Sequence, residues 1–102
     1  MVGYIYRITN IKTNKVYVGI TEDYERRKKK HIKELKNHCH HSPKLQNAWD
    51  YWGEDNFEFT YRKVEISSYE DLYDLEIKEI KKYNSYEDGY NCNSGGRISD
   101  WK

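Results

Sequence analysis

Residues 3–31 read GYIYRITNIKTNKVYVGITEDYERRKKKH, and this stretch decides the fold. Two kinds of side chain alternate along residues 4–9 and again along residues 16–20, which is the period of a β-strand with two different faces. The residues between the two runs are polar and turn-forming, so the pattern predicts an antiparallel hairpin. We expect Tyr6 and Tyr17 to share one face of this hairpin, with their phenol hydroxyls close together.

A basic segment follows the hairpin at once and predicts a helix over about residues 23–37, with Asp23 or Thr21 as its N-cap. At the helical period of about 3.6 residues, Arg27 and His31 fall on the side that packs against the sheet. Titratable groups buried there lower stability unless they meet polar partners. The opposite side is a basic surface suited to DNA phosphates. Its members are Arg26, Lys29, Lys30 and Lys33.

The chain has 102 residues, enough for one domain with a modest core. Its net charge of +1 conceals an asymmetry: the first 37 residues carry ten Lys/Arg against four Asp/Glu, and the remainder carry eight against thirteen. A local basic surface suits a polyanion, although a solvated charged face explains the same lysines. We expect neither a membrane span nor a signal peptide. We interpret Cys39 and Cys92 as reduced thiols of a cytosolic protein.

The middle of the chain predicts a second helix and a third strand. Ser42 is placed to cap a helix that Pro43 begins and Gly53 ends, with an apolar stripe facing the core. Residues 57–66 alternate as a strand. The alternation changes parity near Lys63, which indicates a bulge or the end of the strand.

A third helix is predicted over about residues 69–83, with Ser68 opening a capping signature. Its inward side carries two carboxylates, Glu76 and Glu79, and their spacing alone does not choose between them. In the polar tail, Asn91 is a site residue or a turn former. The element order β-β-α-α-β-α predicts an α+β fold, with a small antiparallel sheet of about three strands flanked by helices.

Histidine and cysteine gather at residues 38–41, which read HCHH. Adjacent loop residues are poorly spaced for one tetrahedral zinc ion, and the sequence offers no second Cys/His pair beyond the lone Cys92. We therefore interpret these histidines as incidental to a loop. A zinc-stabilised interaction domain is the least favoured of the alternatives.

The inward polar groups together favour phosphodiester hydrolysis. One carboxylate can hold a hard divalent cation such as Mg²⁺, which keeps several waters and completes its shell with phosphate oxygens. Arginine can grip a phosphate with two parallel hydrogen bonds. A phenol acts as a general base only after losing its proton, which nearby Arg, His and metal favour. The candidate set is Tyr6, Tyr17, Arg27, His31, a glutamate of the third helix and Asn91.

Short motifs follow one another along the chain, beginning with GYIY at residues 3–6 and VYVG at residues 16–19. The later members are ERR at 25–27, His31, His40, Ser42, KLQ at 44–46, Glu76 and GYN at 89–91. This ordered set covers nearly the whole chain. It resembles the GIY-YIG nuclease domain, especially the catalytic domains of phage and intron-encoded homing endonucleases.

The resemblance implies a role for each site residue. Tyr6 would be the general base or the group that orients water, and Tyr17 would support it or contact phosphate. Arg27 would stabilise the phosphate in the transition state. Glu76, rather than Glu79, would hold the metal ion. The resemblance keeps His31 and Asn91 in the catalytic set and places His40 beside the DNA.

The implied activity is endonucleolytic cleavage of DNA, with one Mg²⁺ or Mn²⁺ ion per active site and 5′-phosphate products. The catalytic domain would span residues 1–94, with a tail or the start of a linker at residues 95–102. We expect DNA as the partner, no membrane, a monomer or transient dimer on DNA, and the cytoplasm of a bacterial or phage-infected host cell. The alternative is a catalytically weak nucleic-acid-binding module that uses the basic face of the 23–37 helix.

Overall fold

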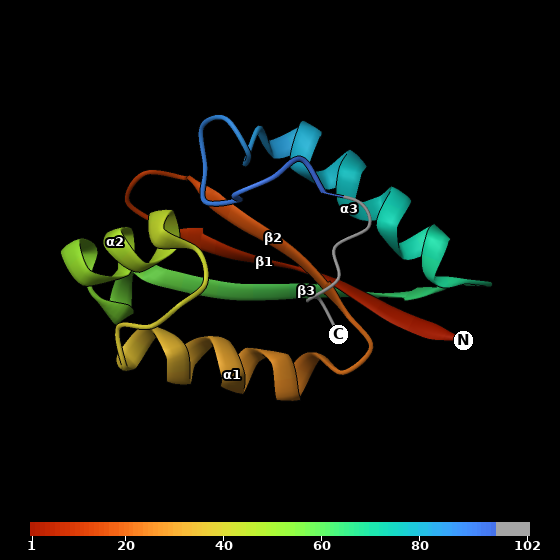
Figure 1. The fold of residues 1–102 in the computed structure, drawn as a ribbon, viewed down its shortest axis with the longest axis horizontal. Helices are drawn as coiled ribbons and strands as arrows, with labels where there is room; N and C mark the ends of the chain where they lie inside the picture. The colour runs from red at the N-terminus through yellow and green to blue at the C-terminus, as the bar shows by residue number, and fades with distance from the viewer. Residues whose placement is uncertain (96–102) are drawn as a thin grey trace.

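The computed structural model describes residues 1–95, whose elements follow the predicted order (Figure 1). They are β1 (Val2–Asn10), β2 (Val16–Thr21), α1 (Tyr24–Lys36), α2 (Pro43–Trp52), a short 3₁₀ turn η1 (Glu54–Asn56), β3 (Phe57–Glu65) and α3 (Tyr69–Tyr83). The predicted α+β class is confirmed. Apart from Gly95, the expected tail or linker lies outside the described residues. In residues 1–95 no helix combines the length and apolar character needed to cross a membrane.

The sheet has the strand order β2-β1-β3, and both pairings are antiparallel. In the hairpin, Tyr6 pairs with Gly19 and Ile8 pairs with Tyr17. Because directly paired residues share a face, Tyr6 and Tyr17 are diagonal neighbours on the same face, as the alternation predicts. The strand β2 lies at an edge of the sheet, so its outer side is open to other parts of the chain.

The strand β3 contains no bulge. It pairs with β1 without interruption over its whole length, Phe57–Glu65, so the change of parity near Lys63 marks no slip in register. Phe59 packs with the core on one face of the sheet, whereas Val64 packs with the core on the other. The parity changes because different faces of the sheet are covered at the two ends of the strand.

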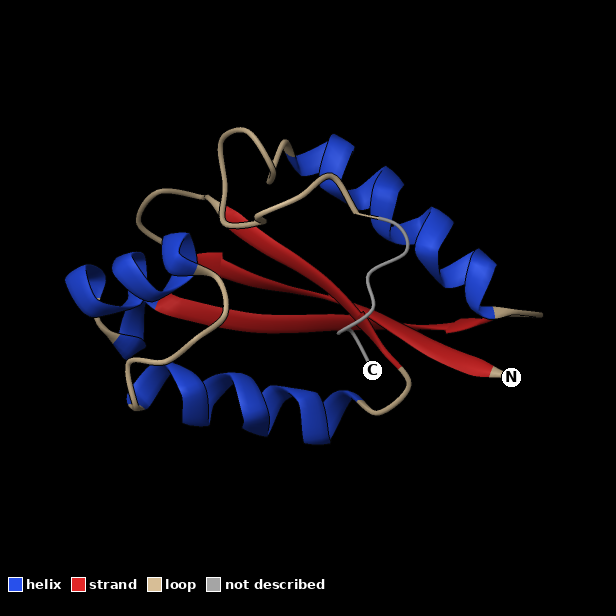
Figure 2. Ribbon diagram, viewed as in Figure 1, coloured by secondary structure: helices blue, strands red, loops and turns tan. Residues whose placement is uncertain are grey.

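Helices cover both faces of the sheet (Figure 2). The helices α1 and α2 pack on the face that carries Tyr6 and Ile8, where Leu35 and Leu45 are fully buried. The helix α3 packs on the opposite face, mainly through Leu72 and Ile80. The sheet therefore separates two apolar cores, and burial of their side chains is the main term that stabilises the fold.

All three helices begin after a predicted capping residue, and two of these residues make a capping hydrogen bond. Asp23 and Ser42 accept hydrogen bonds from backbone amides in the first turns of α1 and α2. Ser68 occupies the N-cap position of α3, but its side chain makes no capping bond. Instead, the amide and hydroxyl of Ser67 donate to Asp71 Oδ2 at 2.8 and 2.7 Å. Ser68 is therefore the N-cap residue as predicted, but the first-turn carboxylate of Asp71 bonds the preceding serine instead of Ser68.

Asn91 fastens the segment after α3 to the open edge of β2. Its Oδ1 accepts from the amide of Val18 at 2.8 Å, and its Nδ2 donates to the carbonyl of Val18 at 2.9 Å, as a neighbouring strand would. The Tyr90 amide also donates to the Val16 carbonyl at 3.0 Å. Lys44 Nζ holds the same segment from α2 by donating to the Asn91 carbonyl at 2.9 Å. These bonds place the segment against the edge strand.

Candidate active site

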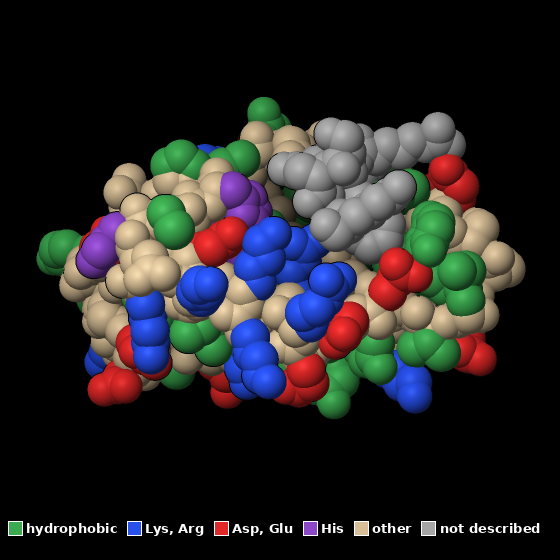
Figure 3. Space-filling model, turned by 60° about the horizontal axis from the view of Figure 1, so that its bottom comes forward, with side chains coloured by type: hydrophobic (Ala, Val, Ile, Leu, Met, Phe, Trp, Pro, Cys, Tyr) green, Lys and Arg blue, Asp and Glu red, His purple; other side chains and the backbone are tan. Residues whose placement is uncertain are grey.

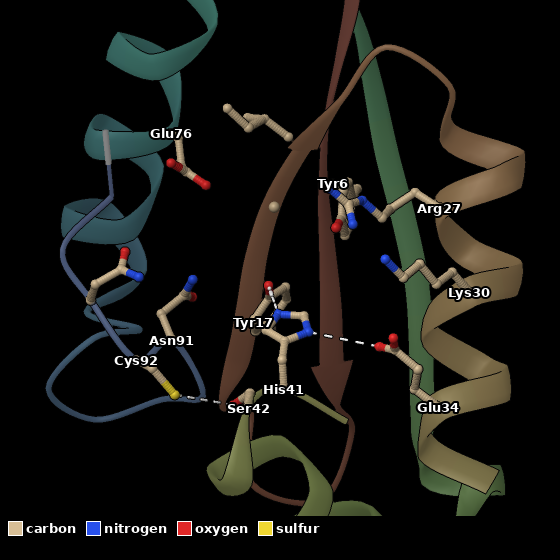
Figure 4. A pocket seen from close by; sticks show the side chains of 13 residues that line it. Tyr6, Tyr17, Arg27, Lys30, Glu34, His41, Ser42, Glu76, Asn91 and Cys92 are labelled. Atoms are coloured by element: carbon tan, nitrogen blue, oxygen red, sulfur yellow. Dashed lines mark hydrogen bonds and ion pairs between the residues drawn. The ribbon is translucent and has the colours of Figure 1, made fainter. Parts of the chain in front are cut away.

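A cleft of about 310 Å³ crosses the edge strand β2 (Figure 4). Five of the six predicted catalytic residues line it: Tyr6, Tyr17, Arg27, Glu76 and Asn91. Because α1 covers one face of the sheet and α3 covers the other, Arg27 and Glu76 reach the cleft from opposite sides of β2. The sixth residue, His31, lies behind Tyr6 and is hydrogen-bonded to it.

The ring of Tyr6 lies over Gly19 on the neighbouring strand. A Cβ at position 19 would stand 2.2 Å from Tyr6 Cζ and 2.3 Å from Tyr6 Oη, far inside any ordinary contact. Glycine is therefore required here, because the phenol passes directly over the backbone of β2. The contact fixes where the phenol oxygen stands in the cleft.

A chain of hydrogen bonds reaches Tyr6 from the loop between α1 and α2. The Ser42 amide donates to His40 Nδ1 at 3.0 Å, His40 Nε2 lies 2.6 Å from His31 Nδ1, and His31 Nε2 lies 2.6 Å from Tyr6 Oη. Burial, followed by the neighbouring imidazoles, lowers the pKa of His31 to about 2. Burial likewise lowers the pKa of His40 to about 3. Both rings are therefore neutral near pH 7, with one hydrogen each.

The direction of the chain follows from its first bond. Because an amide can only donate, His40 Nδ1 accepts, and the ring hydrogen of His40 must be on Nε2. That hydrogen is donated to His31 Nδ1, so His31 carries its own hydrogen on Nε2 and donates it to Tyr6 Oη. His40 is only 7% exposed and bonded at both nitrogens, so neither ring nitrogen is available for the predicted contact with DNA. It supports Tyr6 through His31.

Tyr6 is a neutral phenol in this structure. Burial, followed by the nearby Tyr17, raises the pKa of Tyr6 well above its usual value of 10.0, and Glu76 acts in the same direction. Arg27 acts against them and lowers the pKa of the Tyr6 phenol. The bond from His31 also favours the phenolate, because a donor stabilises negative charge on oxygen. His31 cannot take the phenol's proton on Nε2, since that nitrogen is already protonated.

Tyr17 is hydrogen-bonded to His41, one of the histidines that we interpreted as incidental to the loop. Tyr17 Oη lies 2.9 Å from His41 Nε2, and His41 Nδ1 lies 3.7 Å from Glu34 Oε1 (Figure 4). Both His41 and Glu34 line the cleft. The only sequence signal for the group of Tyr17, His41 and Glu34 was that His41 adjoins His40. That signal does not reveal that the loop returns to the face of β2.

The basic residues of α1 divide between the cleft and the outer surface. Lys30 was predicted on the outer side, but it lines the cleft beside Arg27, because residues three apart lie on one helix face. The remaining three, Arg26, Lys29 and Lys33, are exposed. Figure 3 shows Lys and Arg side chains gathered on this side of the molecule. Lys30 is exposed as well, so all four predicted residues lie on the surface and Lys30 also reaches the cleft.

The two inward carboxylates of α3 have different surroundings. Glu76 is 5% exposed and lines the cleft. Glu79 lies one turn further along the helix, and its Oε1 is 3.7 Å from Arg62 Nη2 on β3. Glu76 therefore lies at the cleft, whereas Glu79 pairs with an arginine outside it. The spacing of the two residues in the sequence could not distinguish them.

One further group in residues 1–95 has the composition of a metal site: His31, Glu34 and His40, whose ligand atoms all lie within 4.8 Å of one another. A histidine ligates a metal through an unprotonated nitrogen. His40 Nε2 carries the hydrogen that bonds His31, and moving that hydrogen to Nδ1 would set it against the Ser42 amide. This group is therefore a hydrogen-bond network and does not fit a metal ion.

Comparison with known proteins agrees with the geometry of the cleft. The family model of the GIY-YIG catalytic domain matches residues 2–91 of the chain. The chain therefore belongs to the GIY-YIG family, as its ordered motifs predict.

The relatives are phage intron endonucleases. Intron-associated endonuclease 1 of Enterobacteria phage T4 is 43% identical over 88 residues, which are 85% of this chain and 35% of that protein. The chain thus spans about a third of its relative's length. A structure of a glutamate-to-alanine variant of the catalytic domain of intron endonuclease I-TevI matches with a TM-score of 0.82 at 36% identity, covering 92% of this chain and 96% of that one. A second structure, of the catalytic domain of homing endonuclease I-TevI, matches with a TM-score of 0.81 at 37% identity, covering 87% and 96%.

Proposed function

We propose that this chain is the catalytic domain of a metal-dependent endonuclease that hydrolyses DNA phosphodiester bonds and leaves 5′-phosphate ends. The observation that carries the proposal is the cleft across β2, which gathers a buried carboxylate, an arginine and two phenols. The name of the T4 relative, an intron-associated endonuclease, supports the same chemistry. A single site of this kind cuts one strand at a time, so we propose a monomer or a transient dimer on DNA.

Glu76 is the residue that would hold the cation. The Glu76 carboxylate on the wall of an open cleft, with phenol oxygens nearby, fits a hard ion that keeps most of its waters, such as Mg²⁺ or Mn²⁺. Such an ion, when bound, offsets negative charge on the phosphate and on the departing oxygen.

Arg27 and Tyr6 act on the phosphate and on the attacking water. Arg27 is half-buried beside Tyr6, where its guanidinium would bind two phosphate oxygens. Tyr6 would orient the water as a neutral phenol, with its oxygen held by the bond from His31. It would act as a base only as a phenolate, the form that Arg27 and the His31 donor favour.

The exposed basic surface of α1 would hold the DNA backbone through Arg26, Lys29 and Lys33, in a manner that weakens as salt rises. The same surface is the observation that favours the second candidate, a nucleic-acid-binding module with little catalysis. The two candidates share the DNA contacts and differ only in what happens in the cleft.

The deciding experiment compares Glu76→Gln with Glu79→Gln on supercoiled plasmid, with Mg²⁺, with Mn²⁺ and with chelator. The two substitutions are the same size and lie one turn apart on α3, but only Glu76→Gln removes a carboxylate from the cleft. We expect wild type and Glu79→Gln to nick the plasmid with either metal and to stop in chelator. Glu76→Gln should lose at least about 100-fold in rate, while gel-shift binding is kept.

Equal nicking by the Glu76→Gln variant would refute the assigned metal ligand. Binding of DNA by the wild type without nicking, at any concentration of either metal, would refute the endonuclease and favour the binding module.

A further inference from the structure

The group formed by Glu34, His41 and Tyr17 has no role in the chemistry described so far. His41 stacks on His40 with ring centroids 4.3 Å apart, which holds its edge towards the cleft. Its Nε2 faces Tyr17 Oη at 2.9 Å, and its Nδ1 faces the Glu34 carboxylate at 3.7 Å. The three side chains form a line from a carboxylate, through an imidazole, to a phenol that lines the cleft (Figure 4).

The surroundings of His41 differ from those of the two buried histidines. The side chain of His41 is 48% exposed, so solvent reaches it. The titratable and charged groups that face it are Glu34, His31 and the nearby Lys30 from α1, Tyr17 from β2, and His40 from its own loop. His31 and His40 stay neutral, and of the groups facing the imidazole only Glu34 adds a negative charge near pH 7. A carboxylate beside one ring nitrogen stabilises an imidazolium that can donate from the other.

Hydrolysis of a phosphodiester also needs a proton for the departing oxygen. The bond from phosphorus to the 3′-oxygen breaks, and its electron pair remains on that oxygen, which becomes a hydroxyl only by gaining a proton. Transfer of such a proton by a positioned side chain contributes about 100-fold to about 10,000-fold in rate. The network behind Tyr6 cannot supply it, because both of its imidazoles are neutral.

We propose that Glu34, His41 and Tyr17 form a proton-donating chain for the 3′-oxygen leaving group, an inference that rests on the proposed endonuclease function. As the P–O3′ bond breaks, Tyr17 gives its hydroxyl proton to O3′ and takes a proton from the imidazolium Nε2 of His41. The imidazole becomes neutral, and Glu34 remains a carboxylate throughout. The water that forms the new P–O bond releases a proton to solvent, and solvent later returns one to His41. Tyr17 is the catalytic residue of this step, and His41 and Glu34 act through it.

The test uses a leaving group that needs no proton. The probe is a duplex oligonucleotide that carries a phosphodiester cut by the wild-type protein, mapped beforehand on plasmid. The same duplex is also made with sulfur in place of the bridging 3′-oxygen, since a thiolate departs without protonation. Single-turnover cleavage is measured with Mn²⁺ for wild type, His41→Ala and the control His38→Ala. His38 is also an exposed histidine of this loop, but its Nδ1 faces Asp50 on α2 at 3.0 Å.

We expect His41→Ala to cut the oxygen substrate about 100-fold more slowly and the sulfur substrate within about threefold of wild type. We expect His38→Ala to match wild type on both. Because His41 is exposed, thermal unfolding should be the same in all three proteins.

An equal loss on both substrates would overturn the inference, because a merely structural role of His41 slows any leaving group alike. An unchanged rate on the oxygen substrate would also overturn it. In both cases the endonuclease itself stands. A wild-type protein that cuts no DNA would instead refute the proposed function, and the proton-donating chain with it.

Discussion

Replacing Gly19 with alanine tests whether the position of Tyr6 depends on bare backbone in the neighbouring strand. The added Cβ would stand 2.2 Å from Tyr6 Cζ, whereas carbon atoms pack at about 3.5 Å or more. The ring must therefore retreat by roughly 1.3 Å, and its 2.6 Å bond to His31 Nε2 cannot survive that movement. Overpacking of a core typically costs about 1–3 kcal/mol. A displacement of about 1 Å in a catalytic group can slow a reaction about 100-fold.

Urea unfolding and single-turnover plasmid nicking measure the two effects of Gly19→Ala. Gly3→Ala is the matched control, because a Cβ there meets the methyl ends of Leu72 at 3.0 Å and of Ile66 at 3.2 Å, and side-chain ends can shift. We expect the control to change stability by less than about 1 kcal/mol. In a Tyr6→Leu background the ring is gone, so Gly19→Ala should cost nothing further. An undiminished cost in that background would show that the clash is not with Tyr6 and would refute the reasoning.

The two remaining predictions concern the hydrogen-bond chains. His31 and His40 stay neutral in the folded protein down to about pH 2 and 3, while the unfolded chain protonates them below its ordinary pKa of 6.5. The unfolded state therefore binds more protons, and the free energy of unfolding should fall as pH falls below 6.5, by up to about 1.4 kcal/mol per pH unit for each histidine. Urea unfolding at pH 7, 6 and 5 measures this slope, which should halve in His40→Gln. Tyr6→Phe should cost about 1–3 kcal/mol because it leaves the buried His31 donor without an acceptor, whereas Tyr17→Phe should cost less because water replaces its bond to the exposed His41. A flat pH profile would contradict the first, and equal losses in the two phenylalanine variants would contradict the second.

Most of the fold could be predicted from local pattern. Alternation gave the hairpin and its shared face, and Asp23 and Ser42 gave two helix starts, because these features depend on residues close in sequence. The bulge expected near Lys63 failed for a nonlocal reason. Which face of β3 is covered depends on where α1, α2 and α3 pack, and the strand's own sequence does not contain that information. Ser68 is the N-cap of α3 as predicted, but the sequence does not reveal that the carboxylate of Asp71 bonds the adjacent Ser67.

The site was predictable as a set of residue types and less so as a set of contacts. Glu76 and Glu79 are alike in spacing, and only the position of the cleft relative to α3 separates them. The family resemblance placed His40 beside the DNA, yet the loop folds inward and buries its side chain. His41, its neighbour, was interpreted as incidental to the loop, yet it lines the cleft. Neighbours in a loop can face opposite ways, so a periodic pattern cannot assign them.

The phenols of Tyr6 and Tyr17 differ most in the hydrogen-bond chain that leads to each of them. The chain behind Tyr6 ends at the Ser42 amide, which can donate a hydrogen bond but cannot accept a proton. It can hold the phenol oxygen in place and favour its negative charge, but it cannot carry the proton away, because a pKa of about 3 keeps His40 from storing it. The chain behind Tyr17 ends at a carboxylate and at solvent, so a proton given up there can be replaced. In-line displacement requires both properties at once: an oxygen held in a fixed position on the side of attack, and a proton donor that solvent can recharge on the side of departure.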